Sequence, residues 1–206
     1  IYQMKILITG AAGFIGFHLV SELLKQKHSI IGVDNLNSYY SSKYKKHRIK
    51  ILKKNKNFEF KKLDLKNKKK LSLLFKINKP DCVLHLASQP GIMYSFKNPN
   101  TYITNNILAT KNLILVSINY KVKKFYFTSS SSVYGNKKKF PIKENSKLKP
   151  INLYAKTKKQ CEIMLINSFK KTNIDLKIFR PFTVYGTYAR PRYDFFNILK
   201  KGLESK

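Results

Sequence analysis

A short apolar run followed by three evenly spaced glycines constrains the fold of this chain more than any other feature. The run covers residues 5–9 and is rich in β-branched residues, which predicts a buried parallel strand. Gly10 suits a tight turn, Gly13 lets the backbone approach a ligand because it has no Cβ, and Gly16 lets a helix pack closely on the strand. The free N–H groups and positive dipole at the start of that helix suit a pyrophosphate, and the alternative is a packing turn without a ligand.

Strand-like and helix-like segments alternate along the rest of the chain, which predicts an α/β fold with a doubly wound parallel sheet. The predicted strands cover residues 4–9, 30–34, 57–61, 82–87, 124–129 and 174–179. The predicted helices cover residues 14–27, 43–54, 68–78, 101–119 and 152–171. Ligands bind at the carboxyl ends of the strands in such sheets, so site residues should follow the strands directly.

An acidic residue ends the second predicted strand. Asp34 lies 18 residues beyond Gly16, at the tip of an apolar run. A carboxylate there accepts hydrogen bonds from the two hydroxyls of a ribose and repels a 2′-phosphate, which favours NAD over NADP. The alternative interpretation is an ordinary turn residue.

Further candidates follow the third and fourth predicted strands. Asp64 and Leu65 are placed to contact an adenine edge, although an acid that caps the next helix is an equal alternative. Leu86, Ala87 and Ser88 suit a backbone that lies beside a cofactor.

The segment around these residues gives three structural expectations. His85 lies within the strand and is expected to be a core histidine rather than a catalyst. Residues 88–99 form a predicted loop that is long enough to carry a substrate contact. In the following helix, an asparagine facing the sheet, Asn105 or Asn106, is expected to anchor a neighbouring strand or loop.

Four consecutive serines, residues 129–132, follow the fifth predicted strand. Hydroxyl groups are unsuited to a core, and at the end of a central strand they form a row of donors for a sugar hydroxyl. A polar turn is the alternative.

Tyr154 and Lys158 open the next predicted helix. Residues four apart share a helical face, and an ammonium group beside a phenol lowers the pKa of the phenol. The pair therefore predicts a general base that works near neutral pH. Their position rather than their spacing selects them, because the same spacing occurs at Tyr39/Lys43, Tyr120/Lys124 and Tyr134/Lys138.

Composition narrows the class of protein. The net charge is +32, yet arginine occupies only four of the 42 basic positions and the lysines are spread over the predicted polar faces. This pattern argues against a nucleic-acid partner, although it should attract anionic ligands. There is no apolar run long enough for a membrane span. The two cysteines, Cys82 and Cys161, belong to no C-x-x-C motif, which predicts a reduced cytoplasmic protein without a structural metal.

The chain resembles an extended short-chain dehydrogenase/reductase of the nucleotide-sugar epimerase/dehydratase group. The motifs that carry the resemblance are the glycines at 10, 13 and 16, Asp34, the serines at 129–132, and Tyr154 with Lys158. Residues 34–40, 129–135 and 182–186 further resemble the UDP-glucuronate 4-epimerase branch.

The resemblance implies a Rossmann-type sheet that binds NAD and acts on a UDP-sugar. It implies that Tyr154, as a phenolate, takes the proton of the sugar C4 hydroxyl, which Ser130 also contacts. Lys158 would lower the pKa of the tyrosine and hold the nicotinamide ribose. Hydride would pass from C4 to NAD⁺ and return on the other face of the sugar, so that C4 is inverted without net oxidation.

The resemblance also assigns contacts residue by residue. The implied cofactor contacts are Gly10, Gly13, Phe14, Ile15, Gly16, Asp34, Asn35, Asp64, Leu65, Leu86, Ala87, Ser88, Asn106, Ser129, Tyr154 and Lys158. The implied substrate contacts are Ser130, Ser131, Thr183 and Arg190.

Sister activities remain as alternatives. The 4,6-dehydratases of this group carry an Asp-Glu pair where this chain has Ser131 and Ser132, and decarboxylating relatives place a glutamate at the second position. The absence of a carboxylate favours epimerisation. A fragment that binds NAD without turnover is a further alternative.

The end of the chain and one substitution depart from the family pattern. We expect residues 1–180 to form the NAD-binding domain and residues 181–206 to begin a truncated substrate-binding lobe, since relatives continue for roughly a hundred residues more. Met93 stands where the branch usually has an arginine. Relatives often dimerise through two helices, which here correspond to 101–119 and 152–171, so a homodimer is expected at full length.

Overall fold

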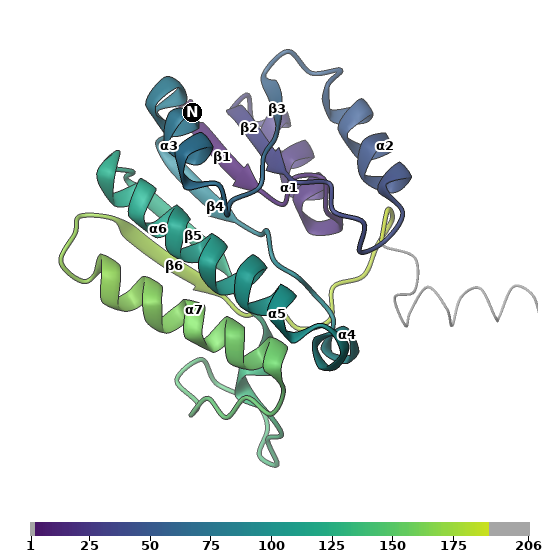
Figure 1. Ribbon diagram of the computed structural model, residues 1–206, viewed down its shortest axis with the longest axis vertical. Coiled ribbons are helices and arrows are strands. Elements are labelled where there is room, and N and C mark those ends of the chain that lie inside the picture. The colour runs from purple at the N-terminus through teal and green to yellow at the C-terminus, as the bar shows by residue number, and fades with distance from the viewer. Residues whose placement is uncertain (1–2, 190–206) are drawn as a thin grey trace, which may run out of the picture.

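Six parallel strands form a single sheet in the computed structural model, which describes residues 3–189. The strands are β1 (Lys5–Thr9), β2 (Ser29–Asp34), β3 (Phe58–Lys62), β4 (Cys82–His85), β5 (Lys124–Thr128) and β6 (Asp175–Phe179). Their spatial order is β3-β2-β1-β4-β5-β6, and every neighbouring pair is parallel (Figure 1). This is the doubly wound, Rossmann-type sheet that the alternating pattern and the resemblance predicted, and its order reverses between β1 and β4.

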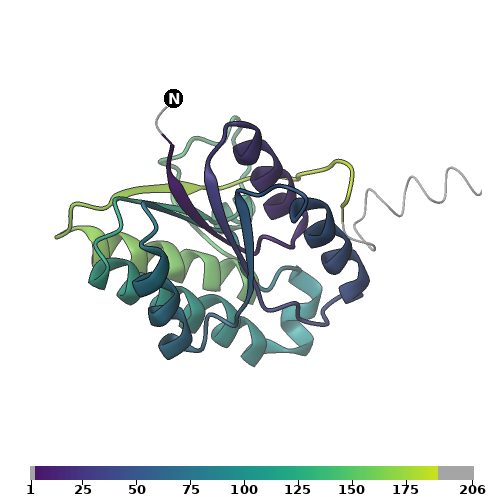
Figure 2. The same ribbon diagram turned by 90° about the horizontal axis from the view of Figure 1, so that it is seen from above.

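Helices cover both faces of the sheet (Figure 2). On one face lie α1 (Phe14–Lys25) and α2 (Ser42–Leu52), and on the other lie α3 (Lys68–Asn78), α6 (Ala109–Asn119) and α7 (Leu153–Phe169). Successive strand residues point to opposite faces, so Ile6 and Ile8 join the core beneath α1 whereas Leu7 joins the core beneath α3 and α6. Burial on both faces explains why the central strands are apolar throughout.

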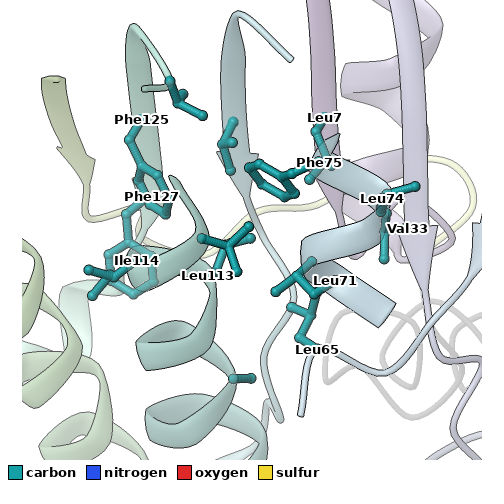
Figure 3. Packing of buried hydrophobic residues seen from close by; sticks show 14 of the residues in the cluster. Leu7, Val33, Leu65, Leu71, Leu74, Phe75, Leu113, Ile114, Phe125 and Phe127 are labelled. Atoms are coloured by element: carbon teal, nitrogen blue, oxygen red, sulfur yellow. The ribbon is translucent and has the colours of Figure 1, made fainter. Parts of the chain in front are cut away.

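The larger core lies between the sheet and α3, α6 and α7 (Figure 3). Leu71 and Phe75 of α3 and Leu113 of α6 are fully buried there, together with Leu7 and Phe125 of the sheet. This packing fixes α6 and α7 on the sheet, and α7 begins next to the carboxyl ends of the strands.

The chain between β4 and α6 differs from the prediction. The predicted loop 88–99 contains a short helix, α4 (Ile92–Lys97), and the predicted helix 101–119 is divided. It consists of α5 (Pro99–Tyr102), a π-helical segment η1 (Ile103–Leu108) and α6. Asn98 has a non-helical backbone and Pro99 starts a new helix, as proline does at a first helical position. Helical segments of the π type are rare in proteins, and those that occur are frequently found at functional sites.

The end of β4 differs from the prediction, whereas the role expected for His85 is confirmed. Strand β4 ends at His85 rather than at residue 87, and Leu86 and Ala87 then pass beside Gly10. His85 is buried, and its ring nitrogens form hydrogen bonds with Thr9 Oγ1 (2.7 Å) and Thr110 Oγ1 (3.0 Å). Burial, reinforced by the charge of Lys158, lowers the pKa of His85 to about 3. His85 is therefore the core histidine that was expected.

Within residues 3–189 no helix has both the length and the apolar character needed to cross a bilayer. Cys82 and Cys161 are buried free thiols. The predicted start of a second lobe at 181–206 falls within the described residues only as far as residue 189.

Candidate active site

A cleft of about 840 Å³ runs along the carboxyl ends of the strands. It is lined by the segments that follow all six strands and by the first residues of α7. Of the residues predicted from the sequence, the cleft brings together Gly10, Gly13, Phe14, Ile15, Gly16, Asp34, Asn35, Asp64, Leu65, Leu86, Ala87, Ser88, Ser129, Ser130, Ser131, Tyr154, Lys158 and Thr183. Arg190 lies outside the described residues.

The glycine turn adopts a conformation that side chains would obstruct. Gly10 has a φ of +73°, and a Cβ there would lie 2.8 Å from the backbone nitrogen of Ala87. A Cβ on Gly16 would collide with the carbonyl oxygen of Gly10. Gly13 precedes the first residue of α1, and no side chain caps this helix. The N-terminus of α1 therefore faces the cleft with free N–H groups, an arrangement that fits a pyrophosphate.

Asp34 ends β2 beside this turn and is almost completely buried. Its Oδ1 accepts a hydrogen bond from Leu36 N (2.8 Å) and lies 3.9 Å from the Nζ of Lys45. Burial raises the pKa of the Asp34 carboxyl, and the nearby Lys45 opposes that rise. Asn35 Nδ2 donates to Asp64 Oδ2 (3.3 Å) at the same end of the cleft. These positions fit the ribose and adenine contacts that were predicted for Asp34 and Asp64.

Asn106 is the predicted cofactor contact that the structure does not bring to the cleft; its neighbour Asn105 lines the cleft instead. The Asn106 side chain is buried, accepts a hydrogen bond from Gln89 N (2.7 Å) and donates one to Thr157 Oγ1 (3.0 Å). It therefore ties the loop after β4 to α7, which is the anchoring role expected for one of the two asparagines.

The serine row turns back on itself after β5. Residues 131–134 form a short 3₁₀ helix, η2 (Ser131–Tyr134), and the hydroxyl oxygen of Ser130 accepts hydrogen bonds from Ser132 N (3.2 Å) and Ser132 Oγ (2.9 Å). The hydroxyl of Ser129 is buried and has no hydrogen-bond partner within residues 3–189. An orphaned hydroxyl at the cleft wall is consistent with a ligand that supplies its partner.

Tyr154 lies in the first turn of α7, which Asn152 caps by accepting a hydrogen bond from Ala155 N (2.9 Å). The Tyr154 ring packs edge-on against Tyr102, with 6.3 Å between the ring centroids. One turn further, the buried Lys158 donates from Nζ to the carbonyl oxygen of Thr128 (2.7 Å) and lies 4.8 Å above the Phe127 ring. Both residues line the cleft beside the serine row, so the structure brings the predicted base, ammonium and hydroxyls together.

Burial of the Lys158 ammonium gives a prediction about stability. Desolvation lowers the pKa of Lys158 from 10.5 to about 8, against the opposing influence of Cys161 and Glu162. Between these two values the unfolded chain binds more protons than the folded one, so the contribution of Lys158 to the free energy of unfolding rises with pH in that window. We expect Lys158→Met to remove this rise, measured by urea unfolding at pH values below and within the window. The control is Lys156→Met, which changes an exposed lysine of the same helix and should keep the rise of the free energy of unfolding with pH. An equal dependence of the free energy of unfolding on pH in the two variants would contradict the prediction.

Sequence reasoning missed an ion pair that fixes α7. Arg180, directly after β6, donates from Nε (3.0 Å) and Nη2 (2.7 Å) to the two carboxylate oxygens of Glu162 on α7. Its Nη1 donates to the hydroxyl of Tyr134 in η2 (3.1 Å), so one guanidinium joins β6, α7 and the serine segment. The hydrogen bonds with Glu162 raise the pKa of Arg180. The partners of Arg180 lie 18 and 46 residues away in the sequence, so no local pattern predicts this contact. The one signal in the sequence is the position of the arginine directly after a predicted strand.

Comparisons with known proteins place the chain in a family and show which proteins it is similar to. The family model described as "NAD dependent epimerase/dehydratase family" matches residues 6–201. The chain is 42% identical to Protein CapI of Staphylococcus aureus over 96% of this chain and 59% of that protein. It is 37% identical to a UDP-glucuronate 4-epimerase of Thermodesulfobacterium geofontis, over 97% of this chain and 62% of that protein.

A solved structure shows the same fold. The UDP-glucuronic acid 4-epimerase of Bacillus cereus, in complex with UDP-glucuronic acid and NAD, superimposes with a TM-score of 0.91 at 38% identity. That comparison covers 98% of this chain and 64% of the Bacillus cereus chain. The chain thus spans about three-fifths of the length of the relatives it matches.

Proposed function

Because the chain belongs to the NAD dependent epimerase/dehydratase family, we propose that it carries the cofactor-binding and catalytic residues of a UDP-sugar 4-epimerase. The substrate we propose is UDP-glucuronate or a related UDP-sugar, in line with the UDP-glucuronate 4-epimerases to which the chain is similar. The observation that carries the proposal is the meeting of the glycine turn, the serine row and the Tyr154–Lys158 pair on one cleft. Residues 181–206 would begin the substrate-binding lobe.

The residues of the cleft fit NAD. The glycine turn and the uncapped start of α1 would hold the pyrophosphate, and Asp34 would accept hydrogen bonds from the adenosine ribose. Ser129, whose buried hydroxyl lacks a partner within residues 3–189, and Lys158 lie where the nicotinamide end would be held. When bound, the nicotinamide supplies an acceptor and later a donor of hydride for the sugar C4.

The chain's own residues would move the proton. Ser130 would hydrogen-bond the C4 hydroxyl and hold it near Tyr154. Tyr154, as a phenolate stabilised by the positive charge of Lys158, would take the hydroxyl proton as C4 is oxidised to a ketone, and would return it after the sugar has turned over. Ser131 and Ser132 offer no carboxylate for the elimination or decarboxylation chemistry of the sister enzymes.

The test uses the intact protein supplied with UDP-glucuronate and, separately, UDP-glucose. NMR of the products reads the configuration at C4 directly. Inversion at C4 with retention of all atoms is the expected result. Release of water would identify a dehydratase, and release of carbon dioxide a decarboxylase. NAD binding without any turnover would identify a protein that binds the cofactor but is not an epimerase.

Asp34 gives a prediction on cofactor affinity. We expect Asp34→Ala to weaken NAD binding about ten- to a hundredfold, because loss of hydrogen bonds to a charged acceptor costs about 1.5–3 kcal/mol. Calorimetry measures the affinity, and thermal unfolding checks the fold. The control is Asp175→Ala, which changes an exposed aspartate at the start of β6, the opposite edge of the sheet. Unchanged NAD affinity in Asp34→Ala would remove the ribose contact.

A second copy of the chain is the partner we propose for the outer faces of α6 and α7. These faces expose apolar side chains, namely Leu115 and Ile118 of α6 and Ile163 and Ile166 of α7. The two helices pack side by side, so two copies could form the four-helix arrangement that the resemblance implies (Figure 1). The cytoplasmic location inferred from the cysteines stays a prediction.

The dimer has a direct test. We expect the double variant Leu115→Lys/Ile166→Lys to sediment as a monomer at concentrations where the wild type is a dimer, because the introduced charges would be buried without partners. The control is Ile77→Lys, which changes an exposed isoleucine of α3. A monomeric wild type would overturn the proposal.

A further inference from the structure

The segment after β6 crosses the glycine turn and fastens on the other half of the sheet. We call residues 181–188 the strap. Figures 1 and 2 both show it leaving β6 and running to α1 and α2. Residues 181–184 line the cleft, and Gly186 lies beside the Phe14 ring, at the start of α1. The strap therefore passes directly over the end of α1 that fits the pyrophosphate.

Three contacts hold the far end of the strap. The ring of Tyr188 packs against Phe17 of α1, with 4.8 Å between centroids, and stacks at 6.2 Å on His47 of α2. A hydrogen bond of 2.8 Å joins His18 Nε2 to the carbonyl oxygen of Thr187. The strap is thus attached to α1 and α2, two helices that lie far from β6 in the sequence.

Arg48 of α2 connects the strap to the glycine turn. Its side chain is 1% exposed. Nη2 donates to the carbonyl oxygen of Tyr188 in the strap (2.7 Å), and Nη1 donates to the carbonyl oxygen of Ala12 in the turn (2.8 Å). Nη1 also donates to the hydroxyl of Tyr40, in the loop after β2 (2.9 Å). One guanidinium therefore holds three segments that are distant in the sequence.

The charge of Arg48 is unusual for such a buried place. Within residues 3–189 no carboxylate lies within 4.0 Å of its guanidinium, and the neighbouring buried Lys45 is matched only by Asp34 at 3.9 Å. Two buried cations and one carboxylate thus surround the turn, which leaves an excess of positive charge beneath it. Burying an unpaired charge is costly, and an anionic diphosphate at the start of α1 would offset that cost.

We propose that Arg48 is a positioning residue that fastens the strap over the dinucleotide site and so sets how slowly the cofactor leaves. The inference rests on the proposed function. In that reaction the sugar exists as a ketone between the two hydride transfers, and a strap that keeps the site closed prevents its release in that state. Arg48 is not among the residues that line the cleft; it acts through the strap and the turn.

The experiment measures NAD release from the intact protein. Arg48→Lys keeps the positive charge but cannot reach all three acceptors, and we expect NAD to leave about ten to a hundred times faster, as for the loss of one or two charge-assisted hydrogen bonds. Tyr188→Ala loosens the strap without altering Arg48 and should also accelerate release. Tyr44→Ala, an exposed tyrosine on α2, is the control and should release NAD at the wild-type rate.

A second readout separates positioning from a general structural role. Hydrogen exchange at residues 183–188 should accelerate in Arg48→Lys and Tyr188→Ala, while the exchange of the central strands stays unchanged. If Arg48→Lys does not fold, Tyr188→Ala carries the test.

The outcomes distinguish the two proposals. A wild type that binds no NAD would overturn the proposed function and this inference with it. NAD binding by the wild type, with release at the wild-type rate in the folded variants, would overturn the role of Arg48 and of the strap alone.

Discussion

Tyr154→Phe is expected to lower the turnover of the proposed epimerisation by about 10²–10⁴-fold, the usual contribution of a general acid–base group. The variant keeps the ring that packs against Tyr102 but has no hydroxyl to exchange a proton with the sugar. The fold and NAD binding should persist, because the glycine turn and Asp34 are untouched. Turnover is measured with UDP-glucuronate under single-turnover conditions, and NAD content is measured on the same sample.

Tyr120→Phe is the matched control for this prediction. Tyr120 has a lysine four residues later, as Tyr154 does, but it directly follows α6 and does not line the cleft. Its hydroxyl forms a hydrogen bond of 3.1 Å with the hydroxyl of Ser72. The control should turn over at close to the wild-type rate. A Tyr154→Phe protein that remained active would show that another group is the base.

Arg180→Ala is expected to lower the free energy of unfolding by about 3–5 kcal/mol, the range for a buried ion pair that loses one partner. Glu162 is 2% exposed, so the variant leaves its carboxylate buried without the two hydrogen bonds that Arg180 donates. Turnover should fall as well, because Glu162 lies one turn beyond Lys158 on the helix that carries the base. Urea unfolding measures the first effect.

A double variant and a surface pair sharpen this test. Removing both charges, in Glu162→Gln/Arg180→Met, should cost less than Arg180→Ala alone, because no unpaired buried charge remains. Lys25→Ala breaks the exposed pair between Lys25 and Glu22 and should cost about 0–1 kcal/mol. Equal losses for the buried and exposed pairs would contradict the assignment.

The sequence predicted the parts of the site that depend on local pattern. The glycine turn and Asp34 were predictable because a tight turn and a strand tip need particular residues at particular places. Tyr154 and Lys158 were chosen by their position after the serine row, since three other pairs share their spacing. Their place on the cleft wall was then a consequence of the sheet, whose parallel strands all end at one edge.

The parts that were missed depend on contacts between distant segments. Arg48 looked like another basic residue on a lysine-rich helix, and its bond to Tyr188, 140 residues away, exists only in the folded chain. The helix predicted over 101–119 is helical throughout but begins two residues earlier, at Pro99, and residues 103–108 adopt π-type hydrogen bonding that the sequence pattern did not indicate. Asn106 was predicted beside the cofactor, yet its amide is used to join the β4 loop to Thr157.

The hydrogen bonds of His85 tie together the two halves of the sheet at their seam. Thr9 ends β1, His85 ends β4, and Thr110 belongs to α6, so one neutral imidazole links the cofactor half to the half that carries the base. Replacing any one of the three residues with an apolar one would leave a buried polar group of its neighbour without a hydrogen-bond partner. Natural variation at positions 9, 85 and 110 should therefore be correlated, with tolerated changes occurring as matched sets.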